Sequence, residues 1–106
     1  MNRIKQISSI GKIIATQFNP ERIVLFGSYA YGKPGLDSDI DLFVVLSHEG
    51  LAARKAAEIR LALPTDIPID IIVRSPDKVK ERLKMHDYFI SEIIEKGHVI
   101  YESNNN

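Results

Sequence analysis

The chain has 106 residues, which predicts a single domain over residues 1–106. With 44% hydrophobic and 26% charged residues it resembles a soluble globular protein, and no apolar run approaches the roughly 20 residues that span a bilayer. The absence of cysteine excludes disulfides and thiolate metal sites, and the N-terminal residues lack the pattern of a secretory signal, so we expect a cytoplasmic protein. A formal net charge of zero argues against nucleic acid as the main substrate, because proteins that grip DNA or RNA usually carry a basic surplus.

The first part of the chain predicts a helix, a strand and two turns. Isoleucines at helical spacing predict a helix over residues 4–18. Residues 22–26 form a short, β-branched apolar run that favours a buried strand. Gly27-Ser28 ends this strand, residues 29–32 have room for one helical turn, and the Lys-Pro-Gly sequence at 33–35 predicts a turn.

The middle of the chain predicts two more strands with a helix between them. Residues 40–46 form a second apolar strand, entered through residues 37–39. A helix runs from about residue 49 and is closed by Pro64. Residues 67–73 form a third strand.

The last part of the chain is mainly helical. Ser75-Pro76 has the pattern of an N-cap followed by proline in the first helical position, and Gly97 is expected to be a C-cap. Whether residues 84–87 divide this helical region in two stays open. Residues 99–101 predict a short final strand, and residues 102–106 are expected to be frayed. The fold class is therefore α/β or α+β, with a mixed sheet of about three to five strands flanked by helices.

Asp39 and Asp41 are the first candidates for a chemical role. Residues i and i+2 of a strand point to the same face, about 6.6 Å apart, so both carboxylates could reach one cation. Two like charges on one face of a strand repel, and a magnesium ion with its preference for hard oxygen ligands would compensate. Asp-x-Asp by itself is explained more simply by Asp39 in a loop and Asp41 on an exposed face.

Asp70 and the pair Gly27-Ser28 add two further signals. Asp70 interrupts an otherwise apolar strand, and one face could carry three carboxylates if that strand lies beside the Asp39–Asp41 strand. The alternative is a polar residue on a half-exposed edge strand, to which Pro68 is suited. Gly27-Ser28, between a strand and a helical turn, could present backbone N–H groups to a phosphate, although the dipeptide alone is explained more simply by an ordinary turn with Ser28 as N-cap.

Other polar and aromatic residues favour structural explanations. The three histidines are widely spaced and form no pattern of metal ligands, Lys33 suits a solvated turn better than a phosphate contact, and Tyr29 and Tyr31 suit packing better than stacking on a base.

The combined motif is more specific than its parts. Gly27-Ser28, ten intervening residues, Asp39-Ile40-Asp41 and a later Asp70 resemble the nucleotidyltransferase superfamily that includes DNA polymerase β, and in particular its minimal nucleotidyltransferases, the MNT or MntA type. The resemblance covers roughly residues 22–101. It implies a mixed sheet flanked by helices, Gly27 and Ser28 on the triphosphate of the nucleotide, and Asp39, Asp41 and Asp70 as catalytic ligands of magnesium. We call these three residues the aspartate triad.

The resemblance also implies a reaction and a partner. The reaction is transfer of AMP from ATP, with two magnesium ions, to an acceptor hydroxyl. Minimal nucleotidyltransferases are commonly paired with a HEPN protein, a small helical ribonuclease toxin, so the implied function is an antitoxin that adenylylates a tyrosine of that toxin. The chain departs from the pattern at Tyr31, where many relatives have an arginine, and it lacks the extra domain with which larger relatives bind their acceptors.

Three hypotheses therefore stand. The first is a protein adenylyltransferase that acts as an antitoxin. The second is a binding module that silences its partner by contact, with a dormant active site. The third is a small-molecule nucleotidyltransferase that is completed by a partner subunit. The intact triad favours an enzyme, and the missing acceptor domain favours a protein acceptor.

Overall fold

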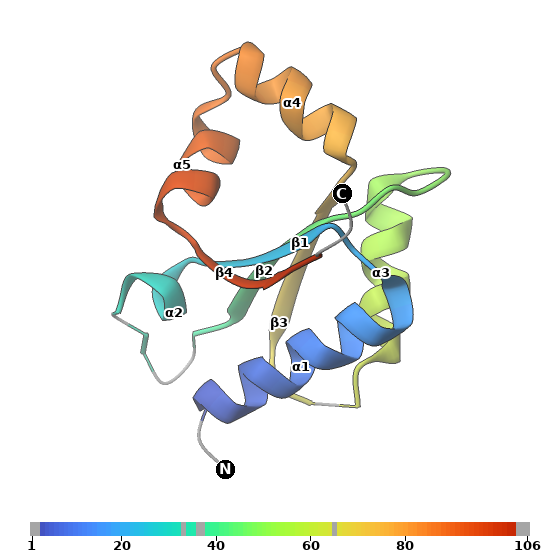
Figure 1. Ribbon diagram of the computed structural model, residues 1–106. Coiled ribbons are helices and arrows are strands. Elements are labelled where there is room, and N and C mark those ends of the chain that lie inside the picture. The colour runs from blue at the N-terminus through green and yellow to red at the C-terminus, as the bar shows by residue number, and fades with distance from the viewer. Residues whose placement is uncertain (1–2, 33, 36–37, 65, 104–106) are drawn as a thin grey trace.

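The computed structural model describes residues 3–32, 34–35, 38–64 and 66–103, and over these residues four strands and five helices form three layers (Figure 1). In chain order the elements are α1 (Arg3–Phe18), β1 (Arg22–Phe26), α2 (Ser28–Tyr31), β2 (Ile40–Val45), α3 (Ala52–Ala62), β3 (Ile69–Arg74), α4 (Pro76–Lys84), α5 (Tyr88–Lys96) and β4 (His98–Glu102). None of the helices in these ranges is long and apolar enough to cross a membrane.

The four strands form one mixed sheet in the order β3-β2-β1-β4. β1 runs antiparallel to both β2 and β4, whereas β2 and β3 run parallel, as expected for strands joined by a helical crossover through α3. The fold class predicted from the sequence is confirmed. β3 is an edge strand, which explains how Pro68 is tolerated just before it: Pro68 has no N–H to donate, but its carbonyl oxygen accepts a hydrogen bond from the N–H of Ile40 at 3.0 Å.

The alternation of side chains along β2 builds a core on each face of the sheet. Ile40, Leu42 and Val44 are buried in the core that includes α1 and α3 residues. Phe43 and Val45 point to the opposite face and pack with residues of α4 and α5. Figure 1 shows the same arrangement, with α1 and α3 on one side of the sheet and α4 and α5 on the other. Because Asp41 alternates with Ile40 and Leu42, it belongs to the α4–α5 face.

The helical region after β3 is divided in two, which answers the question that the sequence left open. His86 has a φ of 59°, a left-handed conformation that ends α4. Asp87 then starts α5 as its N-cap, and its side chain accepts a hydrogen bond from the N–H of Ile90 at 3.0 Å. Ser75 caps α4 and Gly97 caps α5, both as predicted, although Gly97 is extended and not left-handed.

Element ends differ from the predicted ones by a few residues, most clearly at the end of the chain. Glu102, expected in the frayed tail, is the last residue of β4, and its carboxylate forms an ion pair with Arg22 at 2.8 Å. The N–H of Ser103 donates to the carbonyl oxygen of Glu21 at 2.9 Å. The remaining tail (104–106), Lys33 of the predicted turn and Asp37 before β2 lie outside the described residues.

Candidate active site

The turn after β1 places Gly27 and Ser28 at one end of the sheet. Gly27 has φ 75° and ψ −158°, a conformation that is almost restricted to glycine. Its carbonyl oxygen accepts hydrogen bonds from the N–H groups of Ala30 and Tyr31, both at 3.0 Å, so α2 begins at Ser28. The chain therefore turns sharply from β1 into a single helical turn, as the sequence predicts.

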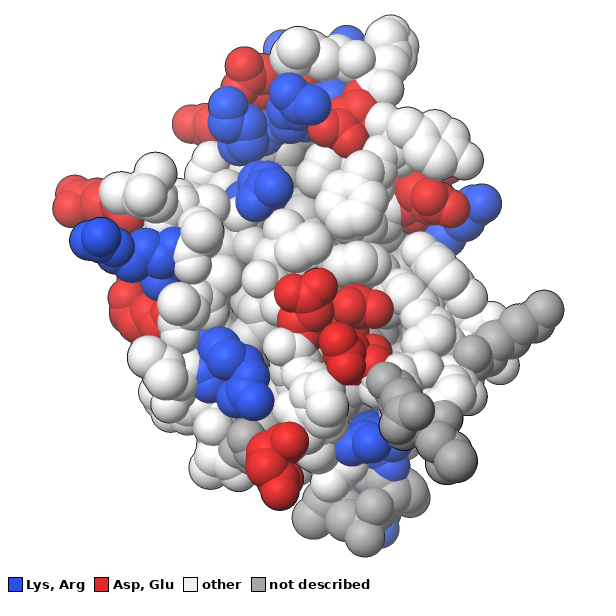
Figure 2. Space-filling view, turned by 180° about the vertical axis from the view of Figure 1, so that it is seen from behind, with Lys and Arg blue, Asp and Glu red and all other residues white. Residues whose placement is uncertain are grey.

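The strand register brings Asp41 and Asp70 side by side. They are direct partners in the parallel β2–β3 pair, so their side chains point to the same face of the sheet. Asp39 lies just before β2, two residues from Asp41, and its negative charge also acts on Asp41. Figure 2 shows a group of acidic side chains near the middle of one face of the molecule, surrounded mostly by uncharged surface.

Asp41 lies between the turn and the other two aspartates. Its partner in the antiparallel pair with β1 is Phe26, the residue just before Gly27. A Cβ atom added at Gly27 would overlap the Oδ2 atom of Asp41 and would lie 3.0 Å from its Cγ atom. Gly27 is therefore required both for its backbone conformation and for the space that the Asp41 carboxylate occupies.

The surroundings of Asp41 disfavour its negative charge. Burial raises the pKa of the Asp41 carboxyl above its usual value, and the neighbouring charges of Asp70 and then Asp39 raise it further. Asp41 is half-buried, whereas Asp39 and Asp70 are exposed. Mutually repelling carboxylates with hard oxygen atoms are the ligand set that suits a divalent cation such as magnesium.

The aspartate triad does not form a closed ligand cage. In the described ranges, no group of three aspartate, glutamate, histidine or cysteine side chains is placed so that it could hold a metal ion. Asp41 and Asp70 are fixed by paired strands, whereas Asp39 precedes its strand and is exposed. Bringing all three carboxylates onto one ion therefore requires movement of at least one side chain.

A cavity of about 470 Å³ lies on the α4–α5 face, at the other end of β2 and β3. It is lined by Phe89 and Ile90 from α5, by Arg74 and Ser75 at the end of β3, and by His48 after β2, among others. The Nδ1 atom of His48 is buried and has no hydrogen-bond partner. Phe89 is 48% exposed and packs edge-on against Phe26, with ring centroids 6.0 Å apart. Phe89 therefore connects this cavity to the turn at Gly27.

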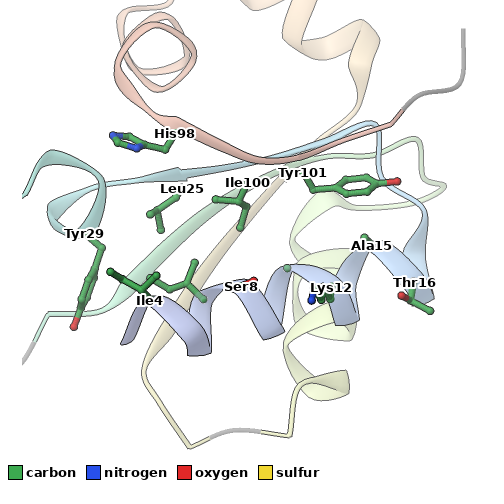
Figure 3. A pocket seen from close by; sticks show the side chains of 12 residues that line it. Ile4, Ser8, Lys12, Ala15, Thr16, Leu25, Tyr29, His98, Ile100 and Tyr101 are labelled. Atoms are coloured by element: carbon green, nitrogen blue, oxygen red, sulfur yellow. The ribbon is translucent and has the colours of Figure 1, made fainter. Parts of the chain in front are cut away.

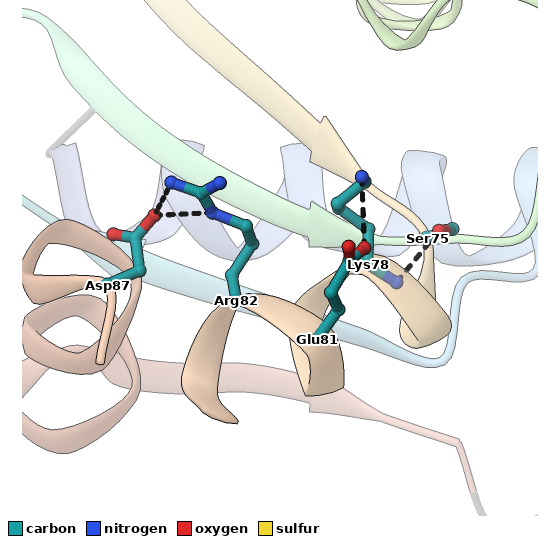
Figure 4. A network of polar contacts seen from close by, with 5 residues as sticks. All are labelled: Ser75, Lys78, Glu81, Arg82 and Asp87. Carbon is teal, nitrogen blue, oxygen red and sulfur yellow. Dashed lines mark hydrogen bonds and ion pairs between the residues drawn. The ribbon is translucent and has the colours of Figure 1, made fainter. Parts of the chain in front are cut away.

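Sequence reasoning missed Phe89 and His48 as residues of this face. The sequence offered one signal for Phe89: the aromatic pair Tyr88-Phe89 lies outside the isoleucine stripe of α5. Figure 4 shows the polar contacts beside the cavity, where Arg82 binds Asp87 at 2.8 Å and Lys78 binds Glu81 at 3.0 Å. Two of the basic side chains of α4 are therefore paired with carboxylates.

Tyr29 and Tyr31, the two tyrosines of α2, have different surroundings. Tyr29 is half-buried; its hydroxyl accepts a hydrogen bond from Nε of Arg3 at 3.1 Å, and the Arg3 guanidinium lies 5.8 Å from its ring centroid. Tyr31 is 44% exposed. Tyr29 therefore has the packing role expected for it.

Comparison with known proteins agrees with this geometry. The chain matches the family described as "Polymerase beta, Nucleotidyltransferase" over residues 8–106. It is 30% identical over 99 residues to a Methanocaldococcus jannaschii protein named "Putative protein adenylyltransferase MJ0141", with 92% of this chain and 97% of that protein covered.

Solved structures of 20% sequence identity share the fold. A crystal structure described as a "putative nucleotidyltransferase" from Sulfolobus solfataricus aligns with a TM-score of 0.66, over 97% of this chain and 83% of that one. A mutant of the toxin–antitoxin MntA-HpeT aligns with a TM-score of 0.57, over 98% and 76%. A toxin–antitoxin structure with AMP-PNP also gives 0.57, over 92% and 74%. The resemblance inferred from the Gly-Ser and Asp-x-Asp motif is confirmed: this chain belongs to the polymerase β-type nucleotidyltransferase family.

Proposed function

We propose that the chain is a magnesium-dependent protein adenylyltransferase that transfers AMP from ATP to a tyrosine hydroxyl of a partner HEPN toxin, and so acts as its antitoxin. The observation that carries the proposal is the pairing of Asp41 with Asp70 beside the Gly27-Ser28 turn. The pairing supports the proposal because phosphoryl transfer needs a turn that can bind phosphate and a set of carboxylates that can hold a metal ion, and both kinds of group lie at this end of the sheet. The whole of residues 1–106 would serve as one domain, working in the cytoplasm where ATP is available.

Each residue of the site has a distinct role in this proposal. The backbone of Gly27 and the hydroxyl of Ser28 would hold the terminal phosphates of ATP. Asp39 and Asp41 would bind the magnesium ion that accompanies the triphosphate, and Asp70 would face a second ion and the incoming hydroxyl. Bound magnesium would neutralise charge on the triphosphate and lower the barrier to deprotonating the acceptor. The chain itself would contribute positioning, since little covalent chemistry is required of the protein.

The cavity at Phe89 offers room for the nucleoside of ATP. Asp70 and Arg74 are four residues apart on β3, about 13 Å along a strand, a distance that an extended nucleoside triphosphate can bridge. The exposed face of Phe89 could stack on the base, since every base has a π-face. The unpartnered Nδ1 atom of His48 provides a polar contact in the same cavity.

The relatives support a protein as the acceptor. The Methanocaldococcus jannaschii relative is named as a protein adenylyltransferase, and two structures of the same fold are toxin–antitoxin proteins. One observation favours a second candidate, a contact-only antitoxin with a dormant site: the described residues form no ready-made metal cage. The two candidates predict opposite results when the partner is examined for covalently bound AMP.

Calorimetric titration with ATP tests the donor site. We expect binding that depends on magnesium and is lost with excess chelator, and loss of this binding in the Asp39→Asn, Asp41→Asn double variant while its circular dichroism remains native. Asp66→Asn is a control for the loss of a negative charge, because it removes an exposed carboxylate without touching the triad. Equal ATP affinity with magnesium and with chelator would contradict the proposed donor site.

A further inference from the structure

A groove of about 750 Å³ lies between α1 and β4, on the face of the sheet opposite to the aspartate triad (Figure 3). We call it the α1–β4 groove. Its interior is apolar and is lined by Ile4, Ile7, Leu25 and Ile100. Figure 3 shows Leu25 and Ile100 projecting from the sheet toward α1, with Ile4 and Tyr29 at one end. The helix layer on this face therefore leaves apolar sheet surface next to α1 incompletely covered.

The apolar surface continues out of the groove onto the surface of the molecule. Ile4 is 80% exposed although it lies on the same helix as the buried residues Ile7, Ile10 and Ile14. Contiguous exposed apolar surface around a concave site is typical of a surface that another protein covers. Leu61 on α3 is also exposed, but it lines neither the α1–β4 groove nor the cavity at Phe89.

The charged residues of the helix that forms one side of the groove have one sign. Every charged residue of α1 is basic, namely Arg3, Lys5 and Lys12, and Lys12 lines the groove itself. The acidic residue of β4, Glu102, is already paired with Arg22 at 2.8 Å. A partner with acidic residues would be attracted to this rim, whereas a basic partner would be repelled.

The basic charge of α1 and the position of the apolar surface inside the groove together favour one kind of binding partner. A second copy of the chain that used the same face would bring the basic side of one α1 against the basic side of the other. A strand added to the free edge of β4 would use backbone hydrogen bonds but leave the floor of the groove uncovered. A helix lying beside α1 in the same layer would cover the floor with its apolar stripe, as helices do on a sheet face.

We propose that the α1–β4 groove is the docking site for an amphipathic helix of another protein, in which an apolar stripe is flanked by aspartate and glutamate. Tyr29, which lines one end of the groove, belongs to α2, the helix that starts at Ser28. A helix docked in the groove is thereby held next to the Gly27-Ser28 turn. The inference goes beyond the proposed adenylyl transfer and does not depend on it, because no residue of the triad contributes to the groove.

Two helical peptides test the proposal by NMR titration of the isotope-labelled chain. Both are hydrocarbon-stapled and share a stripe of leucines at helical spacing; one is flanked by glutamates and the other by lysines. We expect the acidic peptide to bind saturably and to shift the amide signals of Ile7, Gly11 and Ile100, without requiring ATP. Lys12→Glu should weaken the acidic peptide about five- to tenfold and strengthen the basic one, as reversal of a rim charge does.

Matched variants separate the groove from the rest of the surface. Ile4→Asn should weaken binding, whereas Leu61→Asn, at a residue that is 86% exposed and outside the groove, should not. Lys80→Glu on α4 is the control for Lys12→Glu, since both reverse one exposed lysine. The proposal is overturned if both peptides bind equally, if the shifts map to another surface, or if the same amides shift with protein concentration because two copies associate. Loss of AMP transfer with intact peptide binding would refute the proposed function and leave the docking site standing.

Discussion

Gly27 is the residue whose replacement most sharply tests the geometry of the site. Alanine at this position would have to adopt φ 75° and ψ −158°, a region that costs a residue with a side chain about 1–3 kcal/mol. For a domain of about 100 residues, each kcal/mol lowers the melting temperature by roughly 4–8 °C. The new methyl group would also overlap Oδ2 of Asp41 and force that carboxylate to move.

The displacement of Asp41 should affect activity more than stability. A shift of about 1 Å in a positioned catalytic group can cost about 100-fold in rate. We therefore expect Gly27→Ala to remain folded at low temperature but to lose AMP transfer by about two orders of magnitude. Transfer is measured with radiolabelled ATP and the protein encoded by the neighbouring gene, and stability by thermal unfolding.

Gly32→Ala is the control for backbone strain. Gly32 also has a positive φ, 83°, but a Cβ atom there would meet no atom within 4 Å. This variant should lose stability and keep its transfer activity. In the Gly27→Ala background, the second substitution Asp41→Ala should cost less stability than it does alone, because it removes the carboxylate that the new methyl group overlaps. Equal transfer rates in Gly27→Ala and Gly32→Ala would refute the claim that Gly27 holds Asp41 in place.

Three further substitutions test individual roles within the site. Asp41→Asn should raise the melting temperature in chelator, because it removes the negative charge of Asp41 that burial, Asp70 and Asp39 disfavour. Added magnesium should raise the melting temperature of the wild type more than that of the variant. Asp70→Asn should lower the single-turnover transfer rate by about 10²–10⁴-fold, while the ATP dissociation constant rises only several-fold. A transfer rate equal to that of the wild type would show that Asp70 is not part of the site. Phe89→Ala should weaken ATP binding about tenfold through lost stacking, measured by calorimetry, and unchanged affinity would place the base elsewhere.

Much of the fold could be predicted because the sequence is locally consistent. The apolar runs at 22–26 and 40–46 have no competing interpretation, and Ser75-Pro76 marks the start of a helix by known chemistry. The break between α4 and α5 could not be predicted, because it depends on a left-handed His86, and although histidine is enriched in this conformation, most histidines do not adopt it. The sequence alone places Glu102 in the tail, because its partner, Arg22, is remote in sequence and is brought near only by strand pairing.

The site could be predicted from its motif but not from its geometry. Strand periodicity predicts that Asp39 and Asp41 share a face, although Asp39 lies just before β2, whereas the pairing of Asp41 with Asp70 depends on which strands are neighbours and in which register. The contact between Gly27 and Asp41 needs that same register. The aromatic pair Tyr88-Phe89 is visible in the sequence, but the contact of Phe89 with Phe26 depends on how α5 packs against the sheet, which no local pattern specifies.

Intact mass spectrometry of the partner tests the central claim most directly. The protein is incubated with ATP, magnesium and the product of its neighbouring gene, beside the Asp39→Asn, Asp41→Asn variant. A protein adenylyltransferase adds about 329 Da to the partner for each AMP transferred, and the variant adds nothing. Fragmentation should place the added mass on a tyrosine. A partner that is bound and inhibited but keeps its unmodified mass would contradict the enzymatic account and establish the contact-only antitoxin in its place.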